Sequence, residues 1–405
     1  MVEVVPGELA GEAGTRTGAG VAAPEAGPSM TSTALQGQSF KTHRPQVSLR
    51  VPRQRVYTDP AIYEAELARV FDQDWVMVGR QGTIPNPGDY MTVKVGKRPV
   101  VCIRQKDGSI RAFGNFCLHR YAKLLEGRGT AGRIVCPYHS WTYDIGGQLI
   151  GISDPQGFGC TAKSDIRLVE LACEVWLGFV FVSMRHDLPS VASRLGPLAK
   201  HLANYGLETY EDRYTTDEEM WEGNWKLVYE NFVESYHLTY AHPKSIGPSN
   251  PTRLVELGPT AHRQFSIHYN PYRPEDLPEV HNLALTEDER RWFLVIGIYP
   301  NALIGMDANF LWWIMLEPTA IDRTNFRWGL SFTPHAIKGM KDADAYTEAT
   351  RKIFETAIVE DKEMVGRVQE GAAFGAQERG YLHSSLEIYV DEFRQYVDRM
   401  LVVRF

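Results

Sequence analysis

The chain has 405 residues, of which 43% are hydrophobic and 23% charged, and its formal net charge is −7. This composition is typical of a globular protein that is long enough for two domains with ordinary cores. The negative charge and the lack of a basic stripe argue against a nucleic-acid-binding surface, which would need clustered Lys and Arg.

The first 45 residues hold no apolar run and are rich in Gly, Ala, Pro, Thr and Glu. Such a segment cannot bury enough surface to offset the entropy of ordering, so we expect residues 1–45 to be a disordered tail. The start of the chain also lacks the basic and apolar segments of a secretory signal. The most apolar long stretch, 295–316, contains Pro300, Asn301, Asp307 and Asn309, which a membrane-spanning helix would rarely carry. We therefore expect a cytoplasmic protein without membrane contact.

Residues 46–185 are predicted to form an antiparallel β domain. An amphipathic helix over 59–71 comes first, with Asp59 as its start signal and Pro60 in its first turn. Asp107-Gly108 and Gly146-Gly147 are hairpin signals. Short β-type runs separated by turn residues follow the helix, at 82–88, 91–95, 100–104, 111–115, 141–144 and 149–152, and 173–182 closes the domain.

Two loops in this region each offer one thiolate and one imidazole. The first reads Cys117-Leu-His119, and the second reads Cys136-Pro-Tyr-His139. Two mixed pairs are the arrangement in which two Cys hold one iron, and two His the other, of a Rieske [2Fe-2S] cluster. A structural zinc site is the alternative, but zinc fingers usually place both Cys in one knuckle and both His in one helix. The spacing therefore predicts a Rieske centre, which relays single electrons.

The segment Gly127 to Gly132 between these loops matches G-x-G-x-x-G. A dinucleotide fingerprint needs a helix after it, whereas the short β-type run Arg133 to Val135 follows here. We interpret these glycines as turn formers, so the chain has no credible nucleotide site. The remaining cysteines stand singly and are predicted to be reduced, buried thiols; they are Cys102, Cys160 and Cys173.

The second region, 186–405, begins with a helical stretch over 195–205 and changes character at Asn224. The segment 224–242 is predicted to be a helix with one narrow face that carries Leu227, Asn231, Glu234 and Leu238. His237 lies one turn after Glu234. Pro243 disfavours helical geometry at His242, so we expect the helix to end or distort there. That distortion matters because residues five apart on a regular helix do not converge on one ion.

A later helix, from about 341 to 370, offers a third ligand. Asp361 falls at the centre of its apolar stripe, Glu360 at the margin and Glu363 on the far side; the stripe contains Phe354, Ala357, Ile358, Met364, Val365 and Val368. Two His and one carboxylate with open positions form the facial triad of non-haem Fe(II) oxygenases. A buried Asp that is merely hydrogen-bonded is the alternative.

Between these helices, alternating runs predict antiparallel strands at 253–269, 292–300, 308–317 and 325–332. The second domain is therefore expected to be α+β, with long helices across a curved sheet. Four nearby side chains are candidates to line a pocket or, more simply, to fill the sheet core; they are Asp307, Phe310, Trp312 and Trp313.

From Val56 to the C-terminus the chain resembles the α (oxygenase) subunits of Rieske non-haem iron oxygenases, which include ring-hydroxylating dioxygenases and demethylating monooxygenases. The resemblance rests on the motifs Cys117-Leu-His119-Arg120, Cys136-Pro-Tyr-His139-Ser-Trp141, Asn224-Trp-Lys, Glu234-x-x-His237-x-x-x-x-His242-Pro and Glu360-Asp361 before Val368-Gln369. It implies an all-β Rieske domain followed by a helix-grip (START-like) catalytic domain. The implied cofactors are a [2Fe-2S] cluster on Cys117, His119, Cys136 and His139, and a mononuclear Fe(II) on His237, His242 and Asp361.

The resemblance also implies partners. Family members form head-to-tail homotrimers in which the second Rieske His, here His139, contacts an acid beside the iron of a neighbouring subunit, here Glu234. We expect Glu234 and Asn231 to be catalytic residues. Electrons from NAD(P)H would come from a separate reductase, possibly with a ferredoxin, and O2 and a small organic molecule would be the substrates.

Three residues depart from the family pattern. Tyr121 and Ser140 stand where Gly is usual, and Glu234 stands where many members have Asp. Glu at this position is more like members that oxidise quaternary amines, so we expect monooxygenation of a quaternary amine or an N- or O-methyl compound. Dioxygenation of an aromatic carboxylate is the alternative within the family. An electron carrier or a ligand sensor is the alternative of another class, but neither has a use for an open-sided Fe(II) site.

Overall fold

A computed structural model describes residues 54–158, 163–250, 252–259, 264–272, 277, 282–375 and 380–402. The tail expected at 1–45 and Cys160 lie outside these residues. Over the described residues, no helix combines the length and the apolarity needed to cross a membrane.

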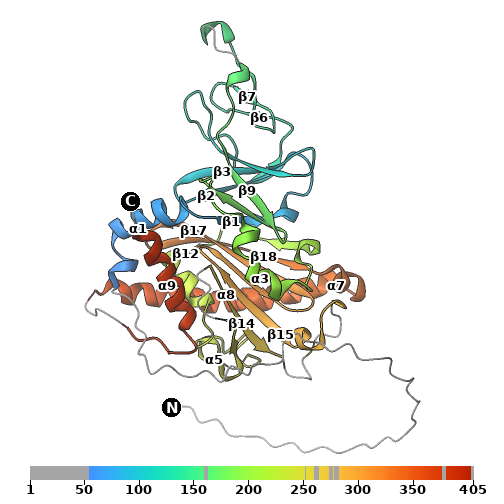
Figure 1. The fold of residues 1–405 in the computed structure, drawn as a ribbon, viewed down its shortest axis with the longest axis vertical. Helices are drawn as coiled ribbons and strands as arrows, with labels where there is room; N and C mark the ends of the chain where they lie inside the picture. Colours follow the sequence, from blue (N-terminus) through green and yellow to red (C-terminus); the bar gives the residue numbers. More distant parts are fainter. Residues whose placement is uncertain are drawn as a thin grey trace, which may run out of the picture. The chain divides into compact units, whose positions relative to one another are not determined.

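The first part of the chain forms an antiparallel β structure, as predicted (Figure 1). A seven-stranded sheet has the order β1-β10-β9-β4-β3-β2-β5, and a three-stranded sheet has the order β6-β7-β8. The strands are β1 (Val76–Arg80), β2 (Asp89–Val95), β3 (Arg98–Arg104), β4 (Ile110–Gly114), β5 (Arg128–Thr130), β6 (Ile134–Val135), β7 (Thr142–Tyr143), β8 (Leu149–Gly151), β9 (Glu170–Trp176) and β10 (Phe179–Ser183).

Two details of the predicted strands are wrong. The run 82–88 is not a strand: a 3₁₀ turn covers Gln81–Thr83, and Pro85 and Pro87, which lack a backbone N–H, follow it. The glycines 127–132 do not only form a turn, because Arg128–Thr130 pairs with β2 as strand β5.

The predicted first helix is present. Helix α1 (Pro60–Glu66) begins after Asp59, whose Oδ1 accepts a hydrogen bond from the backbone N–H of Ala61 at 2.9 Å. The helical path continues as a π-helical segment over Leu67–Phe71.

The second part of the chain contains an eight-stranded antiparallel sheet in which β11-β18-β17-β16-β15-β14-β13 are neighbours and β12 pairs with β18. The predicted α+β class with a curved sheet is confirmed. The sequence patterns did not predict β11 or β16. The strands are β11 (Glu211–Thr215), β12 (Met220–Trp221), β13 (Glu256–Leu257), β14 (Phe265–Pro271), β15 (Trp292–Ile298), β16 (Ala302–Met306), β17 (Phe310–Ala320) and β18 (Arg323–Phe332).

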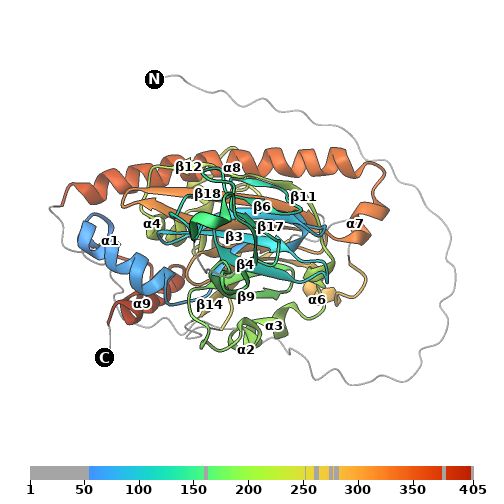
Figure 2. The ribbon, with the colours of Figure 1, turned by 90° about the horizontal axis from the view of Figure 1, so that it is seen from above.

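Long and short helices accompany this sheet, and α8 runs lengthwise beside its strands in both views (Figures 1 and 2). The helices after α1 are α2 (Val191–Arg194), α3 (Gly196–Leu202), α4 (Trp225–Phe232), α5 (Leu238–Ala241), α6 (Glu287–Arg290), α7 (Pro334–Gly339), α8 (Ala343–Ala373) and α9 (Ile388–Leu401). The predicted burial of α8 is confirmed for Asp361, which is 3% exposed, but Val368 is 52% exposed and does not belong to the apolar stripe.

The single helix predicted over 224–242 is wrong. Helix α4 ends at Phe232, and α5 begins only at Leu238. Between them, Oε2 of Glu234 accepts hydrogen bonds from the backbone N–H groups of Tyr236 and His237. A side chain that takes over these donors competes with helical hydrogen bonding, so the chain already bends at Glu234. The predicted end of the helix at His242 is confirmed, because α5 ends at Ala241 and His242 has non-helical φ and ψ values of −112° and 54°.

Buried polar contacts connect the first part of the described chain to the second part. The side chain of Asn301 accepts from the backbone N–H of Met77 at 3.0 Å and donates to its carbonyl at 2.9 Å. Arg80 and Asp212 form a buried ion pair at 2.9 Å, and Lys226 and Glu66 form another at 2.7 Å. Breaking one partner of such a pair leaves an uncompensated buried charge, so these contacts fix both parts of the described chain.

Candidate metal centres

The two Cys/His loops come together at the three-stranded sheet. Cys117 and Cys136 are 1% and 2% exposed, and the rings of His119 and His139 have centroids 4.7 Å apart. The hydroxyl of Tyr143 accepts the backbone N–H of Leu118 at 3.1 Å and lies 3.4 Å from Sγ of Cys117. These contacts hold both thiols inside the small core and both imidazoles together at its edge.

The donor atoms of these loops fit a [2Fe-2S] cluster better than a single zinc ion. Nδ1 of His119 and Nδ1 of His139 are buried and have no hydrogen-bond partner, which leaves both lone pairs available to a metal. A tetrahedral zinc would bring four ligand atoms within about 4 Å of one another. Among the described residues, the four side chains do not form such a compact group.

Both loops close in the same way. The backbone N–H of Tyr121 donates to the carbonyl of Cys117 at 2.8 Å, and that of Ser140 donates to the carbonyl of Cys136 at 3.0 Å. Tyr121 and Ser140 have φ values of 62° and 57°, in the left-handed region. Glycine is favoured there because it has no Cβ, which explains physically why Gly is usual at these two positions.

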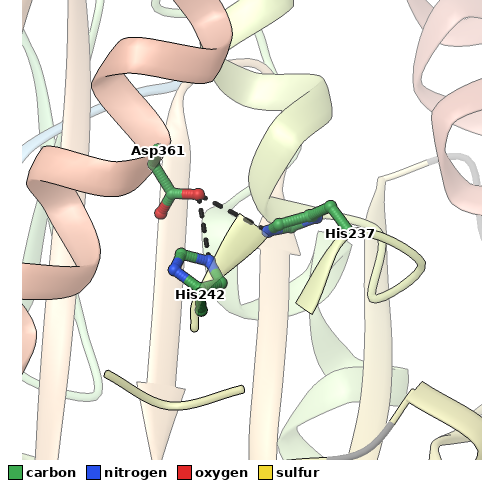
Figure 3. A group of neighbouring side chains, drawn as sticks. All are labelled: His237, His242 and Asp361. Atoms are coloured by element: carbon green, nitrogen blue, oxygen red, sulfur yellow. Dashed lines mark ion pairs between the residues drawn. The ribbon is translucent and has the colours of Figure 1, made fainter. Parts of the chain in front are cut away.

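A second group of donors lies between α4, α5 and α8. His237 and His242 point toward the carboxylate of Asp361, as Figure 3 shows, with their Nε2 atoms 3.5 and 3.2 Å from its Oδ1. One donor atom from each residue lies within 4.8 Å of the others, and this is the only such group within the described part of the chain. Two imidazoles and one carboxylate match the donor set of a facial-triad iron site. The bend at Glu234 and the turn at His242 make this convergence possible.

Each member of this triad has a polar partner. Nδ1 of His237 lies 2.5 Å from Oε1 of Glu234, and Nδ1 of His242 lies 3.1 Å from Oε2 of Glu360. Asn231 donates from Nδ2 to Oδ1 of Asp361 at 2.9 Å. In both histidines the Nδ1 atom has a carboxylate partner, which leaves Nε2 to face the centre of the group.

The electrostatics of the group favour a cation. Burial lowers the pKa of His237, but the carboxylates of Glu234 and Asp361 outweigh burial and raise this pKa to about 10. Burial raises the pKa of Asp361, but contacts with the two imidazoles outweigh it and lower this pKa to about 2. A positive charge is therefore stabilised at the point where the three side chains meet.

A cavity of about 430 Å³ opens onto the triad. Phe310, Trp312 and Asp307 line it, so for these three residues the pocket, which the sequence left open beside simple core packing, is observed. Trp313 does not line the cavity. Successive residues of a strand point to opposite faces, so Trp312 and Trp313 cannot share this one. Sequence patterns did not single out five further wall residues. Four of them belong to β14, β15 or the loop after β14, which contain no motif, and the fifth lies near the start of α8, about four turns before Asp361; they are His268, Asn270, Tyr272, Phe293 and Tyr346.

Family comparisons agree with this arrangement. Residues 74–162 match the profile of the Rieske [2Fe-2S] domain, and residues 207–402 match that of the ring hydroxylating alpha subunit (catalytic domain). The chain belongs to the Rieske oxygenase α-subunit family. A Rieske oxygenase α subunit contains a [2Fe-2S] cluster and a mononuclear iron, and works with electron-transfer partners.

Several relatives of this Rieske oxygenase α subunit act on quaternary amines according to their names. The carnitine monooxygenase oxygenase subunit of Acinetobacter pittii is 28% identical over 80% of this chain and 85% of its own length. The glycine betaine monooxygenase oxygenase subunit of Chromohalobacter salexigens is 33% identical over 47% of this chain and 43% of its own length.

Another relative is named for an aromatic compound. The chlorobenzene dioxygenase subunit alpha of a Cupriavidus species is 34% identical over 52% of this chain and 49% of its own length.

A solved structure shares the fold of this α subunit. The quaternary ammonium Rieske monooxygenase CntA, in complex with an inhibitor, superimposes with a TM-score of 0.75 at 25% identity, over 87% of this chain and 96% of that one.

Proposed function

We propose that this chain is the terminal oxygenase of a multicomponent monooxygenase that acts on a quaternary amine or another N- or O-methyl compound. Cys117, His119, Cys136 and His139 would hold the [2Fe-2S] cluster, and His237, His242 and Asp361 would hold the iron. The observation that carries the proposal is the convergence of His237, His242 and Asp361 at the wall of the cavity. An electron carrier or a ligand sensor would have no use for two histidines and an aspartate that converge at a cavity wall. We place the boundary between the two domains near residue 185, between β10 and α2.

When bound, the two groups supply single electrons and the activation of O2. The balance of the reaction is that O2, two electrons and two protons convert one C–H bond to C–OH and release one water. The cavity residues would hold the C–H bond near the Nε2 atoms of the two histidines and exclude bulk water. Glu234 and Glu360 would keep both imidazoles in the tautomer that presents Nε2 to the iron. Asn231 would hold the carboxylate of Asp361 in place.

The electrons would come from NAD(P)H through a separate reductase, possibly with a ferredoxin, in the cytoplasm. Within the described residues, no hydrogen bond joins His139 to Glu234 of the same chain. We therefore propose that a second copy supplies this connection in a head-to-tail homotrimer. Tyr236, which follows Glu234 closely and is 46% exposed, would be part of that contact.

The names of the relatives favour a quaternary amine, since carnitine and glycine betaine monooxygenases are among them. The chlorobenzene dioxygenase relative and the apolar cavity favour the second candidate, dioxygenation of an aromatic compound, including an aromatic carboxylate. The two candidates differ in how many oxygen atoms of O2 enter the product.

The test is oxygen uptake by the purified protein with NADH and a surrogate reductase, over a panel of quaternary amines, N- and O-methyl compounds and aromatic carboxylates. Mass spectrometry after reaction with ¹⁸O₂ then counts the labelled atoms in the product. We expect one labelled atom and a quaternary amine or methyl compound as the best substrate. Two labelled atoms in an aromatic product would establish the dioxygenase instead. Because an aldehyde released by demethylation exchanges its oxygen with water, release of an aldehyde also counts as monooxygenation, and oxygen uptake without a hydroxylated or demethylated product would contradict both candidates.

A further inference from the structure

One face of the second sheet forms a wall of the cavity, and strand register determines which side chains lie on it. Val295 pairs with Gly305, and Gly305 pairs with Trp312. One step further along the strands, Leu294 pairs with Met306, so Phe293 and Asp307 are the next residues of these two strands. Alternation then puts Phe293, Val295, Asp307 and Trp312 on the same face, and all four line the cavity.

Asp307 is the acidic residue of this sheet face and is 2% exposed. Its Oδ1 accepts the backbone N–H groups of Asn309 at 2.7 Å and Phe310 at 3.0 Å, and its Oδ2 accepts the hydroxyl of Tyr272 at 3.0 Å. These groups are neutral donors. In the part of the chain that the structure describes, no Lys, Arg or His forms an ion pair with this carboxylate.

A turn alone does not explain an acid at this position. The two backbone N–H groups would be satisfied equally well by the amide oxygen of an Asn, which is as common as Asp in such turns. An ionised carboxylate costs several kcal/mol to bury unless a positive charge compensates it. Burial accordingly raises the pKa of Asp307, although its three donors lower it in part. The negative charge of Asp307 therefore destabilises the fold of this region, and a neutral Asn would satisfy the same backbone donors without that penalty.

Aromatic side chains line the cavity on the same sheet face as this carboxylate. The backbone N–H of Asp307 donates to the carbonyl of Phe310, and the backbone N–H of Phe310 donates to Oδ1 of Asp307. The ring centroid of Phe310 is 6.1 Å from that of Phe293. The ring of Trp312 lies 6.5 Å from Phe293. The indole of Trp312 lies over Gly305, so closely that a Cβ at this glycine would come within 2.0 Å of the ring. Ring faces next to a carboxylate are the environment that binds an organic ammonium group through cation–π and charge interactions.

We propose that Asp307, with the rings of Phe293 and Phe310, forms a subsite for the ammonium head group of the substrate. The subsite and the metal triad line the same cavity, so a small cation held at Asp307 would lie in the cavity that opens onto His237 and His242. This inference rests on the proposed function and deepens it, because it names the residues that select a cation and reject an aromatic carboxylate. The negative charge of Asp307 repels a carboxylate in the same place.

The test compares two ligands of almost equal shape that differ in charge. Choline carries a trimethylammonium group, and 3,3-dimethylbutan-1-ol is its neutral carbon isostere. Their dissociation constants are measured by calorimetry on the reduced holoenzyme without O2, so that no turnover is required. We expect the wild-type protein to bind choline about tenfold or more tightly than the isostere. Equal affinities would overturn the subsite.

The decisive variant is Asp307→Asn, which keeps the turn acceptor and removes the charge. It should lose the preference for choline while its affinity for the neutral isostere stays within about twofold of the wild type. An unchanged preference would overturn the role of Asp307. Phe293→Leu is the second variant, since it keeps an apolar wall and removes one ring. It should reduce the preference about threefold, and an unchanged preference would remove Phe293 from the subsite.

The binding test is separate from the test of the proposed function. If Asp307 selects choline over its isostere but no quaternary amine or methyl compound is oxygenated, the monooxygenase proposal fails and the subsite stands. If a quaternary amine is oxygenated but the wild type binds both ligands equally, the subsite fails and the monooxygenase proposal stands.

Discussion

Oε2 of Glu360 lies 3.1 Å from Nδ1 of His242, on the side of the imidazole that faces away from Asp361. The same carboxylate accepts the hydroxyl of Ser245 at 2.5 Å and the backbone N–H of Lys244 at 3.1 Å. Glu360 is thus a positioning residue that ties His242 and the segment after it to helix α8.

Glu360→Gln should weaken mononuclear iron binding by roughly 10- to 100-fold, because a neutral amide no longer fixes and polarises His242. The measurement is an Fe(II) titration of iron-depleted protein. Glu363→Gln is the matched control, since Glu363 lies on the exposed side of the same helix, and its iron affinity should not change. Equal affinities of the two variants would contradict the role of Glu360.

The two metal sets should be separable by mutation. Wild-type protein should contain about three irons per chain, two in the cluster and one at the triad. Cys136→Ser should abolish the Rieske absorption and the EPR signal of the reduced cluster. Asp361→Ala should lose one iron and turnover but keep both Rieske signals. A Rieske signal that persists in Cys136→Ser, or an unchanged iron content in Asp361→Ala, would overturn the corresponding assignment.

Glu234→Gln should slow electron transfer between the two metal sets. Glutamine has nearly the same volume and can still hydrogen-bond, but it lacks the charge that would favour a protonated His139 of a neighbouring subunit. The cluster should be retained, but iron binding at the triad should weaken as in Glu360→Gln, because Glu234 also contacts Nδ1 of His237. The protein is therefore loaded with excess Fe(II) before single-turnover mixing of reduced enzyme with substrate and O2, which should show a stalled reoxidation of the cluster. A wild-type rate in the iron-loaded variant would refute the bridge.

The stability of the protein should depend on pH through Glu230. Burial raises the pKa of Glu230 to about 7 from its ordinary value of 4.5, against the opposing effects of Arg394 and of its hydrogen bond from Tyr57. Because the folded pKa is the higher one, the folded state binds the proton more tightly. Protonation of Glu230 contributes fully to the free energy of unfolding below pH 4.5, and this contribution is lost as the pH rises to about 7. The free energy of unfolding falls by roughly 3 kcal/mol over this range.

Glu230→Gln removes this titration and keeps an acceptor for the hydroxyl of Tyr57. Its melting temperature should exceed that of the wild type by more at pH 8 than at pH 5.5, as measured by circular dichroism. The same difference at both pH values would show that Glu230 does not titrate in this range.

Ser140→Gly should stabilise the second cluster loop. Ser140 has a φ of 57°, where a residue with a Cβ is strained by about 1 kcal/mol. Glycine removes the strain, whereas Ser140→Ala keeps the Cβ and serves as the control. The temperature at which the Rieske absorption bleaches should rise for Ser140→Gly but not for Ser140→Ala. A similar rise for both would assign the effect to the hydroxyl instead.

Features that depend on short distances along the chain could be predicted from the order of the residues. Cys117 and His119 are two residues apart, as the ligands of one loop must be, so their spacing was sufficient to predict the cluster. The position of Asp361 followed from helical periodicity alone, since α8 is a regular helix: Asp361 is buried and Glu363 is exposed.

Which of these surfaces meet depends on packing between segments that are far apart in the chain. Asn231 and Asp361 are 130 residues apart and join through the packing of α4 against α8. Glu234 has its place because its side chain caps a bend, and a helical period cannot anticipate an interrupted helix. Asp307 gains its aromatic neighbours from the register of β15, β16 and β17. Periodicity specifies the face that a residue occupies, but the partner of that face depends on contacts that are distant in the chain.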